Sequence, residues 1–299
     1  MSRSYIIESR DYLLKQGKKY EMIKLALNII LTIGLNLQLS SQVDKIITFN
    51  IRYDNPNDNI DQWNNRKSEI VEFIEYYQPD IFGIQEGLSH QVRYLDSNLY
   101  SYSWIGVGRD DGSNKGEFSA IFYKNEKLKF LKGSTFWLSE KSQEVSVGWD
   151  AAMERICTYG LFEDQTNKQR ILIFNTHYDH IGEKAREKSS RLILEKIQEI
   201  NVAKYPVVLM GDFNAEPHEK PIKIILNEFD HGTLVVKDDI YGPKGTFNGF
   251  DKTTVAERRI DYIFTQGISV QSYRHIDDKM KNGNFLSDHF PVIIEITEQ

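Results

Sequence analysis

Residues 207–214 read Val-Val-Leu-Met-Gly-Asp-Phe-Asn, an apolar run that ends abruptly in a carboxylate and a carboxamide. Short apolar runs bounded by turn residues are typical of strands buried in a sheet. Polar residues stand at the ends of other such runs, at Asn50, Glu86, His177, Asp288 and His289. Side chains that emerge where neighbouring strands stop can meet at one rim of a sheet, so the sequence predicts a polar site there.

Strand-like and helix-like segments alternate throughout residues 43–299, with no linker, low-complexity tract or internal repeat. The predicted strands span residues 46–49, 81–85, 119–124, 129–138, 158–162, 171–177, 207–210, 259–265, 270–275 and 292–297. The predicted helices span residues 66–77, 89–98, 185–201 and 221–228. Strands outnumber helices, which favours packed sheets flanked by helices in a single domain over residues 43–299.

The first 42 residues have a different character. The apolar run Leu25–Leu39 follows Lys24 and is shorter than the ~20 apolar residues that span a membrane. It is typical of a signal peptide, with Met22 as an alternative start. We therefore expect export to the periplasm or the extracellular space and no stable membrane span in the mature chain. A buried amphipathic helix and an uncleaved anchor are the alternatives, and intact residues 1–42 in soluble protein from the native host would contradict export.

Charge and cysteine content narrow the functional class. Cys157 is the only cysteine, which excludes an internal disulfide and predicts a small buried thiol. Removal of residues 1–42 takes away six Lys/Arg and three Asp/Glu and leaves a formal charge of −9. Because non-specific nucleic-acid binding depends on Lys and Arg, this excess of acid disfavours an indiscriminate nuclease. Smaller substrates and a monomeric chain are expected, although a local basic groove would still permit nucleic acid.

The polar residues at the strand ends and near the C-terminus form one candidate set of carboxylates, amides and imidazoles. Its members are Glu86, Asp212, Asp261, Asp288, Asn50, Asn214, His177 and His289. An oxygen-rich set without sulfur suits Mg²⁺ or Mn²⁺ better than structural zinc. Such an ion polarises a phosphoryl oxygen while a carboxylate or His orients the attacking water. Taken singly, Asn50 could cap a turn, Glu86 could pair with an arginine, and Asp212-Phe213-Asn214 could form an Asx turn. As a set, the residues predict metal-assisted phosphoester hydrolysis.

In chain order, these residues resemble the endonuclease/exonuclease/phosphatase superfamily with the deoxyribonuclease-like fold. The matching motifs are Thr48-Phe49-Asn50, Gln85-Glu86, Asn175-Thr176-His177, Gly211-Asp212-Phe213-Asn214, Arg259-Ile260-Asp261-Tyr262-Ile263 and Ser287-Asp288-His289-Phe290-Pro291-Val292. The resemblance covers residues 44–297. It implies an α/β (α+β) sandwich of two stacked, mostly antiparallel β-sheets flanked by helices.

The resemblance also implies roles for the residues that handle the ion and the water. Glu86 would bind the divalent ion, with Asn50 beside it in direct or water-mediated contact. Asp288 would complete the metal region. Asp212 would activate or orient the attacking water.

Further roles concern the phosphate and the charge that develops during the reaction. Asn214 and His177 look like the groups that hold phosphate oxygens. His289, oriented by Asp261, would stabilise the charged transition state or exchange a proton. How Asp212, His177 and His289 share protons is left open by the resemblance, because coupled groups need not titrate individually.

The chain contains the runs Tyr53-Asp54-Asn55-Pro56, Gly148-Trp149-Asp150 and Thr176-His177-Tyr178-Asp179-His180. These runs resemble a bacterial branch of the superfamily with proposed phosphatase or phosphodiesterase activity. Arg52 stands where several nucleases of the superfamily have an acidic residue, which puts a second metal ligand in doubt. It could face a substrate phosphate or pair with Glu86 or Asp288. The remaining candidates for substrate binding are Asp150, Arg155, Asp179 and His180.

The sequence thus predicts an exported Mg²⁺/Mn²⁺-dependent phosphatase or phosphodiesterase. Its expected substrate is a small sugar-, polyol- or lipid-linked phosphate. One alternative is a metal-dependent endo- or exonuclease that acts on DNA or RNA. A second is a binding protein that keeps the fold but has lost turnover.

Overall fold

The computed structural model describes residues 43, 45–229, 241–253 and 255–296. The predictions for residues 1–42, including the signal peptide and the alternative start at Met22, lie outside these residues, as does the end of the predicted last strand. Within the described part, no helix is both long enough and apolar enough to cross a membrane.

Two β-sheets carry the fold. One is six-stranded, in the order β12 (Val270–His275), β13 (Val292–Ile296), β1 (Lys45–Asn50), β2 (Ile81–Gln85), β6 (Ile121–Lys124) and β4 (Tyr102–Ile105). The other is five-stranded, in the order β11 (Asp261–Gln266), β10 (Val207–Asp212), β9 (Arg170–His177), β8 (Ile156–Asp164) and β7 (Leu128–Trp137). Within these two sheets, every described strand pair is antiparallel except β1–β2 and β9–β10. The predicted mostly antiparallel pairing is confirmed.

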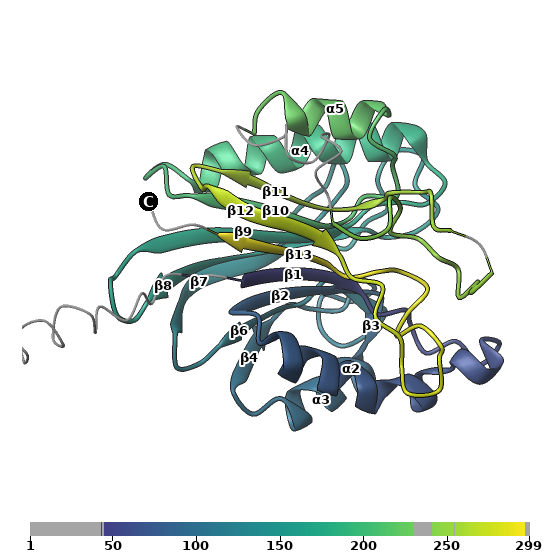
Figure 1. Cartoon of the computed structure of the whole chain (residues 1–299). Coiled ribbons are helices and arrows are strands. Elements are labelled where there is room, and N and C mark those ends of the chain that lie inside the picture. The colour runs from purple at the N-terminus through teal and green to yellow at the C-terminus, as the bar shows by residue number, and fades with distance from the viewer. Residues whose placement is uncertain (1–42, 44, 230–240, 254, 297–299) are drawn as a thin grey trace, which may run out of the picture. The chain divides into compact units, whose positions relative to one another are not determined.

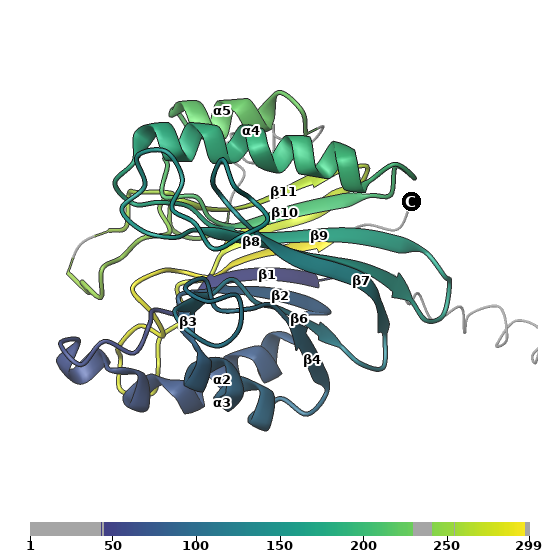
Figure 2. The ribbon, with the colours of Figure 1, turned by 180° about the vertical axis from the view of Figure 1, so that it is seen from behind.

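Helices cover the outer faces of the two sheets, so the described domain has four layers (Figures 1 and 2). Helices α2 (Trp63–Tyr77) and α3 (Ser89–Asn98) lie against the six-stranded sheet, and α4 (Glu183–Ile200) and α5 (Lys220–Leu226) lie against the five-stranded sheet. A short 3₁₀ helix, η1 (Asn59–Asp61), precedes α2. The apolar stripe of α2 is buried, as its helical period predicted. The predicted sandwich flanked by helices is confirmed.

Three short strands were not predicted. They are β4 and the two strands of a small separate pair, β3 (Gly87–Leu88) and β5 (Glu117–Phe118). Two residues are too few to show any periodicity, so β3 and β5 exist only because tertiary contacts place their backbones side by side.

A buried carboxamide joins the two sheets. The Asn175 Nδ2 atom of β9 donates hydrogen bonds to the carbonyls of Ile84 and Ala120, both at 2.9 Å, and Oδ1 accepts one from Gln85 Nε2. Gly83 makes room for this side chain, since a Cβ atom at Gly83 would lie 2.7 Å from the Asn175 carboxamide. The close approach of the sheets therefore depends on a glycine on one side and an amide on the other.

We expect Asn175→Ala to lower the free energy of unfolding by about 3 kcal/mol, because it leaves buried polar groups of the opposite sheet without partners. Denaturant unfolding measures this loss. The matched control is Asn65→Ala, which removes one exposed hydrogen bond to the carbonyl of Ile60 and should cost well under ~1 kcal/mol. Equal effects of the two substitutions would contradict a role for Asn175 in joining the sheets.

Candidate active site

Strands of both sheets end at one rim and bring their polar end residues together. In the five-stranded sheet, Asp212 of β10 lies opposite His177 of β9 and Asp261 of β11. In the six-stranded sheet, Asn50 is the last residue of β1 and Glu86 follows β2 directly. The Asn50 Nδ2 atom donates a hydrogen bond to Asp212 Oδ2 at 3.0 Å, so the strand ends of the two sheets are in direct contact.

Gly211 is required where β9 and β10 approach each other just before Asp212. Its φ of +147° lies in a region that L side chains rarely adopt, and a Cβ atom there would lie 2.0 Å from the carbonyl oxygen of Thr176. Only glycine fits this position without displacing the strand, which places Asp212 beside His177.

Asp212 is the centre of the cluster. Its Oδ2 atom lies 3.5 Å from His177 Nε2 and 3.8 Å from His289 Nε2. Its Oδ1 atom accepts a hydrogen bond from the Asn214 backbone amide at 2.9 Å. Burial and, to a lesser extent, the nearby Asp261 carboxylate raise the pKa of Asp212 to about 7, against the effect of His289. This carboxylate can therefore take up a proton near neutral pH.

His289 forms a buried pair with Asp261. The His289 Nδ1 atom lies 2.9 Å from Asp261 Oδ2, which leaves Nε2 directed towards Asp212. Burial opposes protonation of His289, but the carboxylates of Asp261 and Asp212 raise its pKa well above the ordinary value. His289 is therefore held as a cation that Asp261 orients.

The pKa of His177 is shifted in the opposite direction from that of His289. Burial lowers the pKa of His177 well below its ordinary value, and the guanidinium groups of Arg155 and Arg109 lower it further. The Asn214 Nδ2 atom lies 3.2 Å from His177 Nε2 and also donates to the carbonyl of Tyr178. A neutral imidazole beside an amide can hold phosphate oxygens without adding a charge.

The residues predicted to bind the metal differ in their contacts. Glu86 Oε1 accepts a hydrogen bond from Asn50 Nδ2 at 3.0 Å, and one ligand atom each from Glu86, His177 and Asp212 lies within 4.8 Å of the others. Asn50 Oδ1 instead accepts the Arg52 backbone amide. Asp288 lies outside this group of ligand atoms within the described chain, and its Oδ2 atom is 3.6 Å from Arg52 Nη1.

The donor set formed by Glu86, His177 and Asp212 fits a divalent cation. Each of the three residues is predominantly buried and offers an oxygen or imidazole nitrogen, and no thiolate competes. This chemistry suits a hard or borderline ion. Glu86, with Asp212 beside it, would hold the ion.

Among the predicted substrate residues, Arg52, Arg155 and His180 line the same cavity as the cluster. Arg155 is buried, its Nη2 atom lies 2.9 Å from His180 Nδ1, and its Nε atom pairs with Asp179 at 3.4 Å. Its Nη1 atom is buried and has no hydrogen-bond partner among the described residues. A buried guanidinium group that lines a polar cavity is suited to an anionic ligand.

Asp150 and Asp179 have other partners. The Asp150 carboxylate accepts the backbone amides of Ala185 and Lys184, so it caps the first turn of α4 and is absent from the cavity lining. Asp179 accepts the amides of Ile181 and Gly182. The substrate role predicted for these two aspartates gains no support from these contacts.

Sequence reasoning missed two charged residues of the site, Arg109 and Glu117. Their guanidinium and carboxylate groups form a two-bond pair at 2.7 and 3.0 Å, and Glu117 Oε2 lies 3.7 Å from His177 Nδ1. Burial raises the pKa of Glu117, against the effect of Arg109. The glycines at positions 108, 112 and 116 were the available signal, since they indicate a tight turn that brings residues 109 and 117 opposite each other.

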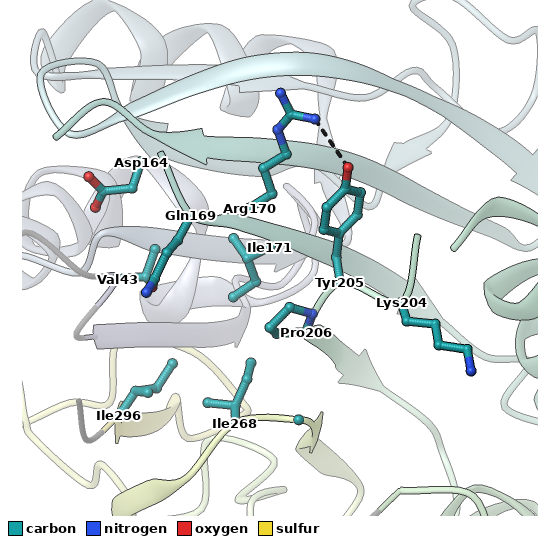
Figure 3. A pocket seen from close by; sticks show the side chains of 11 residues that line it. Val43, Asp164, Gln169, Arg170, Ile171, Lys204, Tyr205, Pro206, Ile268 and Ile296 are labelled. Carbon is teal, nitrogen blue, oxygen red and sulfur yellow. Dashed lines mark hydrogen bonds between the residues drawn. The ribbon is translucent and has the colours of Figure 1, made fainter. Parts of the chain in front are cut away.

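These groups line a cavity of about 440 Å³, a size suited to a small ligand. Its remaining lining includes Tyr53, Met153, Phe247, Arg258 and Ile260. A second cavity, of about 260 Å³, lies at the other end of the strands, where β9 and β10 begin (Figure 3). It is lined mainly by apolar residues such as Ile171, Pro206 and Ile296. We therefore place the candidate active site in the first cavity.

Comparison with known proteins identifies the family of the chain. Residues 47–289 match the Endonuclease/Exonuclease/phosphatase family. A solved structure of a Bacteroides thetaiotaomicron mannosyl-6-phosphatase is 36% identical, with a TM-score of 0.80, over 85% of this chain and 99% of that one. An uncharacterized mimivirus protein is 27% identical over 78% of this chain and 91% of its own length. A probable RNA exonuclease of Saccharomyces cerevisiae is 26% identical, but over only 54% of this chain and 34% of its own length.

The family match, the two-sheet sandwich and the buried acid–imidazole cluster lead to one assignment. The protein belongs to the endonuclease/exonuclease/phosphatase family and is a divalent-metal-dependent hydrolase of phosphoric esters.

Proposed function

We propose that the enzyme is a Mg²⁺- or Mn²⁺-dependent phosphatase that removes the terminal phosphate from a small sugar- or polyol-linked monoester. The observation that carries the proposal is the buried Arg155 Nη1 atom, which has no hydrogen-bond partner among the described residues, beside the cluster around Asp212. A terminal phosphate presents one more non-bridging oxygen than a diester, and that oxygen can accept this N–H.

The arginines of the cavity support an anionic substrate. Four arginines line the cavity, namely Arg52, Arg109, Arg155 and Arg258. Arginine binds phosphate oxygens with charge-assisted hydrogen bonds. The mannosyl-6-phosphatase, similar over nearly its whole length, supports a sugar-linked phosphate.

We assign roles to the residues on the basis of their positions in the cavity. Asp212 accepts a proton from the attacking water, while His177 and Asn214 hold non-bridging oxygens. His289, kept protonated by Asp261, stabilises the charge that develops and returns a proton to the leaving oxygen. When bound at Glu86, the divalent ion neutralises phosphoryl charge.

A substrate panel tests the proposal. Release of phosphate from mannose 6-phosphate, inositol monophosphate and glycerol phosphate is compared with cleavage of phosphodiesters, RNA and DNA, each with Mg²⁺, Mn²⁺ or chelator. One charge-assisted hydrogen bond is worth roughly 1.5–3 kcal/mol, so we expect kcat/KM to favour monoesters by about 10- to 100-fold. This preference should fall in Arg155→Met. Faster cleavage of RNA or DNA, with a steep loss in salt, would instead identify a nuclease.

A further inference from the structure

The sulfur atoms of the described residues differ in their access to solvent. Met210 and Met280 are 0% and 3% exposed, so their sulfurs lie in the core. Cys157 is also buried, and burial raises the pKa of its thiol, which keeps it out of the reactive thiolate form. Met153 is only half-buried and lines the cavity of the candidate active site. Among these four residues, a small solute in the cavity can therefore reach the sulfur of Met153 alone.

The sulfur of Met153 contacts a guanidinium group of the cavity. Arg109 Nη2 donates a hydrogen bond to Met153 Sδ at 3.0 Å and another to Glu117 Oε1 at 3.0 Å. Arg109 Nη1 donates to Glu117 Oε2, which lies 3.7 Å from His177 Nδ1. A continuous series of polar contacts therefore connects Met153 to His177, an imidazole of the catalytic cluster.

An accessible thioether reacts with hydrogen peroxide to give a sulfoxide. The sulfur lone pair attacks one peroxide oxygen, an S–O bond forms, and the O–O bond breaks. The second oxygen takes up the remaining peroxide proton and leaves as water, so the sulfur loses two electrons and the peroxide gains them. Arg109 can donate a hydrogen bond to the oxygen that acquires negative charge beside Met153. The position of this sulfur therefore favours its oxidation.

A sulfoxide at position 153 disturbs the cavity whichever way its oxygen points. If the oxygen points towards Arg109, it cannot fit between two atoms that are 3.0 Å apart, because an N–H···O bond alone needs about 2.7–3.2 Å. Arg109 must then move and weaken its pair with Glu117. If the oxygen points into the cavity, it places a hydrogen-bond acceptor beside the phosphate oxygens of the substrate, which are acceptors too. Both positions lower the rate of phosphoester hydrolysis.

We propose that Met153 is a modification site, at which oxidation by peroxide lowers the activity of the enzyme and reduction of the sulfoxide restores it. Methionine sulfoxide is a reversible product, because dedicated reductases return it to the thioether. The effect on activity rests on the proposed function, whereas the site of oxidation does not depend on it.

The test treats the full chain with hydrogen peroxide in the presence of a metal chelator and removes the peroxide before the assay. Peptide mass spectrometry should show one added oxygen at Met153 before Met210 or Met280 reacts. With Mg²⁺ restored, kcat/KM for the best ester of the substrate panel should fall by about tenfold or more, the effect of one charge-assisted hydrogen bond. Treatment with methionine sulfoxide reductases should then return kcat/KM to its starting value.

Three variants separate oxidation of Met153 from other damage. Met153→Leu keeps the approximate volume of the side chain without its sulfur, so peroxide should leave its activity at its own untreated level. Met280→Leu is the matched control, since it removes a core sulfur outside the cavity lining and should leave the loss on treatment unchanged. Met153→Gln puts a hydrogen-bond acceptor at this position, so it should lower kcat/KM without peroxide.

The outcomes distinguish this inference from the proposed function. Full activity of a chain oxidised at Met153 would overturn the inference, as would an equal loss on treatment in Met153→Leu and in the unsubstituted chain. Oxidation of Met210 or Met280 ahead of Met153 would also overturn it, and this measurement needs no substrate. Absence of phosphate release from every ester before treatment would instead contradict the proposed function.

Discussion

Asp212→Asn should reduce kcat by about 10²- to 10⁴-fold, the range of a positioned proton acceptor. The carboxylate is buried, has a raised pKa of about 7, and lies within 3.8 Å of both imidazoles. The amide keeps the shape of this side chain but cannot accept the proton of the attacking water. Steady-state phosphate release by the purified chain measures the loss.

Asp212→Asn should not lower the thermal stability of the chain, although it lowers the activity. Because folding raises the pKa of Asp212 from its ordinary 3.8 to about 7, its stabilising contribution is complete below pH ~3.8 and is lost as pH rises through ~7. The neutral Asn variant does not incur this loss, so at pH 8 its melting temperature should equal or exceed that of the unsubstituted chain.

Asp96→Asn is the control for this prediction, since it makes the same chemical change at an exposed position of α3. Its activity and melting temperature should both be unchanged. Retention of full activity by Asp212→Asn would remove Asp212 from the reaction. If the melting temperature of Asp212→Asn falls strongly, misfolding would account for its loss of activity, and a catalytic role would not be supported.

His289→Ala should lower kcat by about 10²- to 10³-fold, the usual effect of removing one group that stabilises developing charge. Its Nε2 atom lies 3.8 Å from Asp212 Oδ2, and Asp261 holds the other side of the ring. Phosphate release again measures the loss. Full activity of this variant would show that the imidazole is only structural.

The pH profile of Asp261→Asn distinguishes an electrostatic role for the His289–Asp261 pair from a purely structural one. Burial lowers the pKa of His289, whereas Asp261 and Asp212 raise it, so removal of the Asp261 charge must lower it. Activity that needs protonated His289 falls as pH rises through this pKa. The alkaline limb of the rate profile should therefore move to lower pH in Asp261→Asn, whereas a residue that merely fills space would lower the rate equally at every pH.

The long elements were predictable because their patterns are local. Helix α3 has the predicted bounds, and α4 differs from its prediction by two residues at the start and one at the end. Helix α2 begins three residues before its predicted start. Trp63 is buried and precedes Ile70 by seven residues, or two helical turns, so it lies on the same face as the predicted stripe. No apolar residue stands between Trp63 and Ile70, so the apolar pattern did not indicate the first turn.

The sequence by itself determined the buried strands, the polar residue at the end of each strand, and the ion chemistry of those residues. All three follow from which residues are apolar and which side chains offer oxygen or nitrogen. None of the three depends on contacts between residues far apart in the chain. The run Gly211-Asp212-Phe213-Asn214, for example, predicts from sequence alone a strand end with candidate catalytic residues.

Only the tertiary structure decided which polar groups face one another. It placed Arg52 beside both Glu86 and Asp288, assigned Asp150 to the cap of α4, and added Arg109 and Glu117 to the cavity. The physical reason is that partner choice and pKa depend on distance and burial between residues far apart in the chain. Chain order fixes neither quantity until the two sheets have packed.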